Sequence, residues 1–224
     1  MHGSYAAQIA DAGGPDVAVG TARYPVTLQE RPELRVDGTR LVSTGAIDAS
    51  HASVIAGEAA AQKGPFYIQG EYHWMEIERR NSALSNPDFS GWYVEGSWIL
   101  TGEQRKYNTS TFAFDAPPVA HPFDLKKHTW GAWELALRYS DLDLNYDQGS
   151  AGQAAAADAV RGGDQKIFTA GVNWYLNPIV RFMVDYQHVD IDRLSPSATT
   201  YATPVGAEIG QKYDVLAVRS QLAF

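Results

Sequence analysis

The chain has 224 residues, a formal net charge of -8, 45% hydrophobic residues and no cysteine. The lack of cysteine excludes disulfides and thiolate metal sites, and the acidic balance argues against a nucleic-acid partner, because a phosphate backbone attracts a basic surface. No run approaches the roughly 18 apolar residues of a membrane helix. A helical membrane protein is therefore excluded, whereas a strand-built one, in which polar and apolar residues alternate, is not.

The amino-terminal third carries the weakest signals. Residues 1–9 are short and ambiguous, and 10–24 are rich in Gly, Ala and Asp, which indicates a connection. The stretch 26–36 alternates with the period of a strand, but it contains Pro32, which cannot donate to a ladder, so we expect a bulge or an edge. A glycine-bearing loop is predicted over 37–49. The alanine-rich stretch 49–61 is predicted as a weak strand, although its propensity also suits a helix.

Five further stretches alternate clearly between apolar and polar residues, the period of a β-strand. In the first of them, Phe66, Ile68 and Tyr72 fall on one face, whereas Tyr67 and Glu71 fall on the other. All six tryptophans lie in these stretches, and we interpret them as lipid-facing or interface residues rather than sugar-stacking platforms. The stretches are 66–78, 89–101, 128–145, 166–176 and 179–191.

The last stretch, 212–224, alternates in the same way and stops on Phe224. One of its faces is apolar except for Ser220, and the other is more polar and carries Arg219. An apolar outer face, a polar inner face and a terminal aromatic residue are typical of the closing strand of an outer-membrane barrel. From this stretch alone, the last strand of a soluble sandwich is an equal alternative.

The lengths of the strands and their connections favour the barrel. About eight strands of ten or more residues suit tilted membrane strands of about 9 to 11 residues and exceed the usual soluble length of about 5 to 6. Very short turns at 62–64 and 177–178 alternate with long loops, as in bacterial barrels with short periplasmic turns. The connection 102–127 breaks this rule, because it is long where a short turn is expected. The predicted long loops are 37–49, 78–88, 146–164 and 194–211.

Four motifs resemble the carboxy-terminal half of the phosphate-selective porin O and P family. They are RPELRVDGTRLVSTGAI (31–47), GPFYIQGEY (64–72), GAWELALRYSDLDLN (131–145) and GGDQKIFTAGVNWYLNPIVRFMVDYQHVDIDRL (162–194). The resemblance covers most of the chain from about Arg31. It implies an all-β, antiparallel transmembrane β-barrel of about sixteen strands, in which residues 1–224 form one domain of about eight or nine strands.

The resemblance also implies a location, partners and a function. The full chain would be a homotrimeric porin among the lipids of the bacterial outer membrane. Its terminal aromatic residue resembles the signal read by the outer-membrane assembly machinery. It would form a water-filled channel for passive diffusion of small anions, phosphate or polyphosphate among them. In that family some segments fold into the lumen, and 102–127 is our candidate for such a segment.

Our candidates for guiding anions are arginines and lysines at the inward-facing strand positions, which we call the inner parity, or in the segment 102–127. Guanidinium groups suit this role because they replace part of a phosphate's hydration. The alternative is that they form salt bridges to glutamates across the strands, or lie in a solvated turn. The inner parity balances five bases with six acids, Glu33, Glu58, Glu71, Glu95, Glu134 and Asp185. The anion-guiding candidates are Arg31, Arg35, Arg105, Lys106, Lys126, Lys127, Arg138, Arg181 and Arg219.

Other functional classes find little support in the sequence. No catalytic motif is present and the six histidines show no ligand spacing, so we expect no enzyme, cofactor or metal. An outer-membrane lipase would need a serine beside a histidine on one strand face, and His188 has no serine partner in its strand. A soluble lipid-binding barrel would need an apolar interior, whereas the inner face here carries charged residues. A general porin with little anion selectivity stays open, because the inner charges balance.

The amino terminus predicts an incomplete molecule. It lacks the basic segment, the apolar stretch and the cleavage site of a signal peptide, which an outer-membrane protein requires. We therefore expect the sequence to be the carboxy-terminal part of a longer chain that is entered midway through a strand. Because unpaired edges are costly in lipid, we expect an incomplete, curved sheet rather than a small closed barrel.

Overall fold

The computed structural model describes residues 2–9, 25–34, 38–80, 83–111, 113–197 and 204–222, the first range by its backbone only. All regular structure in these ranges is β-strand. The strands are β1 (His2–Ile9), β2 (Gln29–Glu30), β3 (Val42–Ser43), β4 (Ala49–Lys63), β5 (Phe66–Arg79), β6 (Asp88–Ile99), β7 (Tyr107–Asn108), β8 (Ala113–Phe114), β9 (Ala132–Tyr146), β10 (Val160–Tyr175), β11 (Val180–Asp192) and β12 (Gln211–Leu222).

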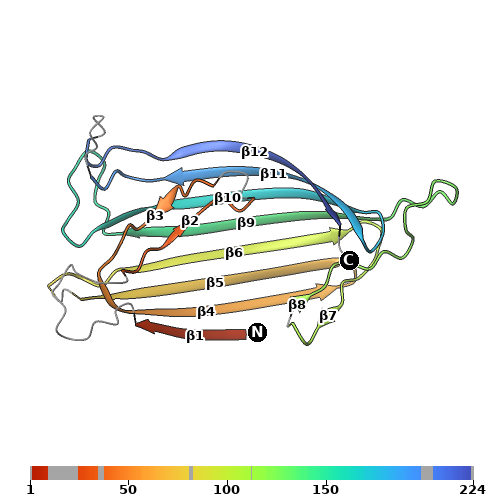
Figure 1. Cartoon of the computed structure of the whole chain (residues 1–224), viewed down its shortest axis with the longest axis horizontal. Helices are drawn as coiled ribbons and strands as arrows, with labels where there is room; N and C mark the ends of the chain where they lie inside the picture. Colours follow the sequence, from red (N-terminus) through yellow and green to blue (C-terminus); the bar gives the residue numbers. More distant parts are fainter. Residues whose placement is uncertain are drawn as a thin grey trace.

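The eight long strands form one antiparallel sheet in the order β1-β4-β5-β6-β9-β10-β11-β12 (Figure 1). Each long strand pairs with the next long strand in the sequence, so local connections build the whole sheet. Within the described part of the chain, β1 pairs only with β4 and β12 pairs only with β11. The all-β antiparallel fold is therefore confirmed, and the eight strands form an open, curved sheet without closure.

Strand alternation gives the sheet two chemically different faces. On the outer face, the side chains of Leu137, Leu216 and Val218 are 57%, 73% and 74% exposed although they are apolar. On the inner face, Gln69, Glu95 and Arg138 follow one another across β5, β6 and β9 through the pairs Gln69↔Glu95 and Glu95↔Arg138. The sequence predicts this arrangement, since a period of two sends neighbours to opposite faces.

The connections divide between the two ends of the sheet. We call one end the loop end, because residues 80–87, 147–159 and 193–210 connect strands there. The other is the turn end, where the tight turns 64–65 and 176–179 lie. The long connection 100–131 also lies at the turn end and projects beyond the strands (Figure 1).

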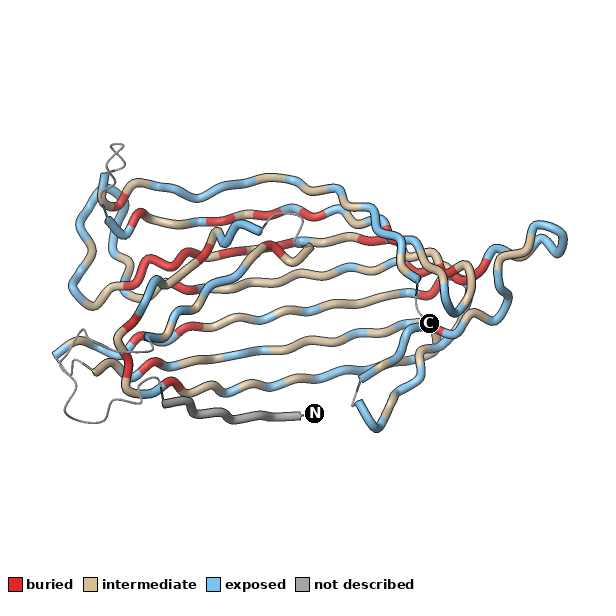
Figure 2. The backbone as a smooth tube through the Cα atoms, in the orientation of Figure 1, coloured by how far each residue is buried: buried red, intermediate tan, exposed pale blue. Residues whose placement is uncertain are grey.

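The strand expected over 26–36 is wrong. Residues 25–34 and 38–48 instead cross the inner face as a short hairpin segment, in which β2 pairs with β3 and not with the sheet. Val42 and Ile47 of this segment are buried in a core with apolar inner-face residues near the loop end. Figure 2 shows buried stretches of the strands at that end. The segment's apolar residues thus gain burial inside the curve, which an outer strand would not give them. The core partners are Ala49, Ala52, Ile77, Phe89, Leu144, Val160, Ile167, Val189 and Ile191.

Arg193, just beyond β11, ties the hairpin segment to the sheet. Its Nη1 and Nη2 donate to the carbonyls of Leu41 and Ser43 at 2.9 and 3.0 Å, and its Nε donates to the carbonyl of Arg161 at 3.2 Å. Burial lowers the pKa of the Arg193 guanidinium, and these three carbonyls compensate for the lost water. The hairpin is therefore held by polar contacts as well as by its core.

β10 begins earlier than the sequence predicts, because the loop expected over 146–164 is shorter. Its ladder with β9 shifts register between Arg161 and Asp164. Gly163 within this bulge has φ +98, a conformation that other residues rarely adopt, and a side chain there would meet Val42 and Arg193. Gly162 and Gly163, which fall inside the loop predicted over 146–164, thus lie in a bulge beneath the hairpin segment.

The sequence predicts that the outer face contacts lipid, and the two faces of β12 give a test of this prediction. In the full-length protein, we expect Val218→Arg to lower the free energy of unfolding by about 2–4 kcal/mol, the cost of an arginine on the lipid side near the bilayer midplane. Ala217→Arg is the matched control, because residue 217 faces inward and pairs with Asp185. Urea titration in lipid vesicles measures both, and equal losses would contradict the assignment of the faces.

Candidate functional site

The centre of the inner face is organised around Arg138 on β9. Its Nε donates to Glu33 Oε1 at 2.9 Å, and its Nη1 donates to Glu95 Oε2 at 2.8 Å. The guanidinium also lies over the ring of Tyr93, 3.6 Å from the ring centroid. Glu95 belongs to the wall and Glu33 to the hairpin segment, so Arg138 attaches that segment to the wall.

A second ion pair lies nearer the turn end, around Glu134 on β9. The side chain of Glu134 is 0% exposed and forms an ion pair with Arg105. Its Oε2 accepts hydrogen bonds from Tyr175 Oη at 2.7 Å and from Asn173 Nδ2 at 3.1 Å. A fully buried carboxylate is stable only when it is paired and hydrogen-bonded in this way.

Arg105 comes from the connection between β6 and β9, and part of that connection lies on the inner face. The ring of Phe114 on β8 meets the inward-facing ring of Tyr67 edge-on, with centroids 5.1 Å apart. Gln62 Nε2 donates to the carbonyl of Arg105 at 3.0 Å. The two inward segments are thus attached by ion pairs of opposite sense, one through a wall arginine and one through a wall glutamate.

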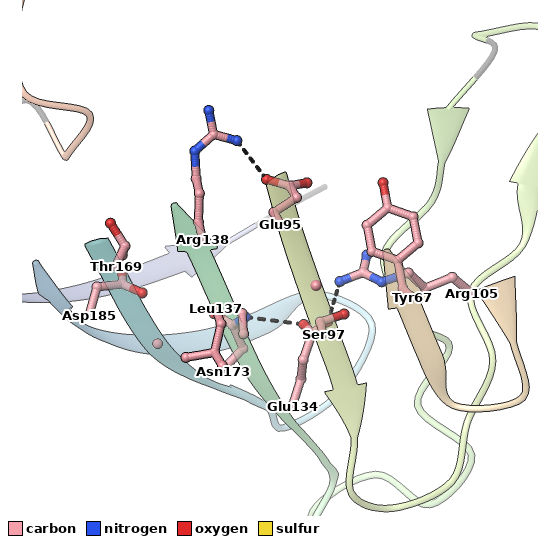
Figure 3. Close-up of a pocket in the computed structure, with 13 residues that line it drawn as sticks. Tyr67, Glu95, Ser97, Arg105, Glu134, Leu137, Arg138, Thr169, Asn173 and Asp185 are labelled. Carbon is pink, nitrogen blue, oxygen red and sulfur yellow. Dashed lines mark hydrogen bonds and ion pairs between the residues drawn. The ribbon is translucent and has the colours of Figure 1, made fainter. Parts of the chain in front are cut away.

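Several hollows remain between these segments and the wall, and two of them border the ion pairs. One, of about 210 Å³, lies between the ion pairs and is lined by Tyr67, Ser97, Thr169 and Asp185 as well as by the paired residues (Figure 3). The other, of about 590 Å³, lies beneath the hairpin segment, where Arg31, Glu33 and His73 face Arg138. Charged side chains of both signs border each hollow beside apolar groups, so a hydrated ion would meet polar partners in either one.

The structure divides the candidate arginines into paired and unpaired groups. Arg105 and Arg138 form ion pairs. Arg181 donates to Gln221 Oε1 at 3.0 and 2.6 Å, whereas Arg219 lies exposed on the inner face of β12. Within the described ranges, the guanidinium groups of Arg31, Arg181 and Arg219 have no carboxylate oxygen within 4.0 Å. Arg35 lies outside the described residues.

Two of the three candidate lysines lie away from the arginines. Lys106 is exposed and adjoins β7, on the inner side of the turn end. Lys126 and Lys127 are exposed in the turn between Asp124 and Thr129. Lys127 Nζ is 3.8 Å from Asp124 Oδ2, with its side chain 79% exposed. The connection 102–127 therefore divides into an inner part that carries Arg105 and an exposed turn that carries the two lysines.

Sequence reasoning missed the neutral partners of the charged residues. By strand alternation, these partners face the same side of the sheet as the charged residues Glu95, Glu134 and Arg138. This shared face is the signal in the sequence that could have placed them near the charges. The partners are Tyr93, Asn173 and Tyr175. Glu33 lies in the hairpin segment and not on a neighbouring strand, so strand alternation gives no indication that it forms an ion pair with Arg138.

Within the part of the chain that the structure describes, no group of three or more His, Asp or Glu side chains is placed to hold a metal ion.

The described residues contain no helix with the length and apolarity needed to cross a membrane.

Comparison with known proteins identifies relatives. The family model described as phosphate-selective porin O and P matches residues 3–224. The chain is 29% identical over 143 residues to Porin O of Pseudomonas aeruginosa, an alignment that covers 64% of this chain and 31% of the relative. It is also 29% identical over 168 residues to an uncharacterised protein of Caulobacter vibrioides, covering 75% of this chain and 31% of the relative. The chain thus spans about a third of the length of these relatives.

The pair Arg105–Glu134 should be energetically coupled. Breaking a buried ion pair by removing one partner costs about 3–5 kcal/mol, so we expect Arg105→Met and Glu134→Leu each to destabilise the full-length protein by that order. The double variant should lose less than the sum, because neither charge is then left alone. Urea titration of the four proteins measures the coupling.

Lys106→Met is the control for this cycle, since it removes the neighbouring charge from an exposed position. We expect it to change stability by less than about 0.5 kcal/mol. Strictly additive effects of Arg105→Met and Glu134→Leu would show that the ion pair does not hold the segment.

Proposed function

Because the chain belongs to the phosphate-selective porin O and P family, we propose that it forms part of the wall of a water-filled channel in the bacterial outer membrane. Small anions, phosphate or polyphosphate among them, diffuse passively through this channel. The proposal is supported by an outer face of exposed apolar side chains and an inner face of charged and hydrogen-bonding ones. A channel wall needs the first toward lipid and the second toward water.

The observation that carries the anion preference is the set of inner-face arginines without a carboxylate partner. Arg181 and Arg219 lie on adjacent strands, β11 and β12, and Arg31 lies in the hairpin segment. Their positive charge is not cancelled by a close ion pair within the described ranges. Such groups attract an anion and bind it weakly enough for it to leave, as conduction requires.

Arg105 and Arg138 have a different role in this proposal. Their charges are compensated by Glu134, Glu95 and Glu33, and they fix the positions of the two inward segments. These segments narrow the space beside the wall, so solutes pass close to the unpaired arginines. The paired arginines thus determine the width of the passage, and the unpaired ones determine its electrostatic potential.

A general porin with little anion selectivity is the second candidate, and specific observations favour it. Glu71 on the inner face accepts a hydrogen bond from Tyr93 Oη at 2.6 Å and lies near His73 and Glu58, so β4 and β5 contribute negative charge. Asp185 lies close to Arg219 and reduces its effect. The measured selectivity decides between the two candidates.

The complete protein, in our proposal, is a barrel of about sixteen strands that assembles as a homotrimer with the help of the outer-membrane assembly machinery. Two observations support the larger barrel: the edge strands β1 and β12 each pair on one side within the described residues, and the matched relatives are longer than this chain. Transport through such a barrel is passive and needs neither a catalytic residue nor a cofactor.

Neutralising the unpaired arginines should reduce anion preference. In the full-length protein, we expect Arg181→Gln/Arg219→Gln to lower the chloride-to-potassium permeability ratio by about twofold per arginine. Two unit charges 10 Å apart in water interact by about 0.4 kcal/mol, which corresponds to that factor. Reversal potentials across a planar bilayer in a salt gradient give the ratio, and added phosphate should reduce the chloride current.

Lys166→Gln/Lys212→Gln is the matched control. It removes the same charge from the outer faces of β10 and β12, where the two lysines form ion pairs with Asp164 and Asp190. We expect this variant to keep the wild-type ratio. A wild-type ratio near one would favour the general porin, and the absence of any current would contradict the channel.

A further inference from the structure

The turn that contains Lys126 and Lys127 has a surface of its own, separate from the inner face. Its base is the ring of Phe123, which meets the ring of Trp174 edge-on with centroids 5.6 Å apart and also contacts Trp130. Trp174 stacks on Trp133 and contacts Phe182, and these side chains belong to the apolar outer face. The turn is therefore continuous with the face that we assign to lipid.

The exposed part of the turn is both apolar and basic. Leu125 and Trp130 are 67% and 57% exposed, and Ile179 in the adjacent turn is 51% exposed. Lys126, Lys127 and His128 are exposed beside them. A local cluster of positive charge is unusual in a chain with a net charge of -8. Aromatic and aliphatic residues next to lysines are the composition of a membrane interface, where rings lie at headgroup level and ammonium groups reach the phosphates.

The backbone holds this turn in a defined shape. Asp124 and Thr129 exchange two backbone hydrogen bonds of 3.0 and 3.1 Å, and the backbone N–H of Phe123 donates to the carbonyl of Leu176 at 2.7 Å. Asp124 Oδ1 accepts the backbone N–H groups of Lys126 and Lys127 at 2.9 and 3.4 Å. Asp124 is thus engaged mainly by the backbone of the turn, through Oδ1, while its Oδ2 lies 3.8 Å from Lys127 Nζ. The side chain of Lys127 is nevertheless 79% exposed, so both lysines are accessible on a fixed backbone.

From these observations we propose that residues 121–130 form a lipid anchor at the turn end. Phe123, Leu125 and Trp130 enter the interfacial region of the bilayer, and Lys126 and Lys127 bind the phosphates of anionic phospholipids such as phosphatidylglycerol. This goes beyond anion passage and rests on the proposed membrane location only. It assigns the two lysines to the lipid boundary and accounts for the length of a connection that joins adjacent strands.

Competitive quenching of tryptophan fluorescence by brominated lipids tests the anchor. The full-length protein is reconstituted into phosphatidylcholine vesicles that contain either brominated phosphatidylglycerol or brominated phosphatidylcholine. Each lysine near an anionic surface contributes about 1 kcal/mol, so Lys126→Gln/Lys127→Gln should lower the relative affinity for phosphatidylglycerol by about fivefold per lysine. Trp130→Phe identifies the part of the quenching that arises at the turn.

Three controls make the result specific. Lys106→Gln removes a lysine from the inner part of the same connection and should keep the wild-type lipid preference. Lys126→Arg/Lys127→Arg should retain most of the preference, which excludes misfolding as the cause of a loss. High salt should weaken the wild-type preference, because exposed charges are screened.

An unchanged lipid preference in Lys126→Gln/Lys127→Gln would overturn the anchor. So would a fall in the permeability ratio as large as that of Arg181→Gln/Arg219→Gln, which would place the lysines in the passage. The anchor and the channel can fail separately, because lipid quenching does not depend on current.

Discussion

The continuous antiparallel ladder from β1 to β12 is the constraint on which the rest of the structure depends. Each pairing fixes its neighbour's register, and with a period of two it also fixes which side chains face inward. Glu95 and Arg138 meet across β6 and β9 because of this register, as do Glu134 and Asn173 across β9 and β10. A slip of one residue would exchange the apolar and the polar faces, so the ladder fixes the chemistry of both surfaces.

The inward segments use this fixed wall as a template. Neither segment has a long strand of its own. Each is therefore held in place by a charged wall side chain, whose position along its strand is fixed by the ladder. Glu33 reaches Arg138 from one segment, and Arg105 reaches Glu134 from the other. The apolar core around Val42 then adds burial near the loop end, where the wall carries isoleucine and valine.

The sequence predicts the strands better than it predicts the contacts between segments. Periodicity identifies β5, β6 and β9 to β12, because alternation is local, whereas the alanine-rich β4 is predicted only as a weak strand. It fails at 26–36, where the same alternation belongs to a segment inside the curve and Pro32 is the only warning. It separates the inward charges from the outward residues, but it does not say that Arg138 is paired while Arg181 is not. Arg138 pairs with Glu95 on the adjacent strand and with Glu33, and Glu33 approaches from 105 residues away in the sequence.

The opposite sense of the two ion pairs has a consequence for divergence within the family. A pair such as Arg105–Glu134 keeps its net charge if its two members exchange signs, so compensated changes at both positions leave the field along the wall nearly unaltered. The guanidinium of Arg219 has no carboxylate within 4.0 Å among the described residues, so it forms no such exchangeable pair. Contacting positions can therefore change together, whereas in the channel that we propose each unpaired arginine is constrained by the electrostatic potential of the passage.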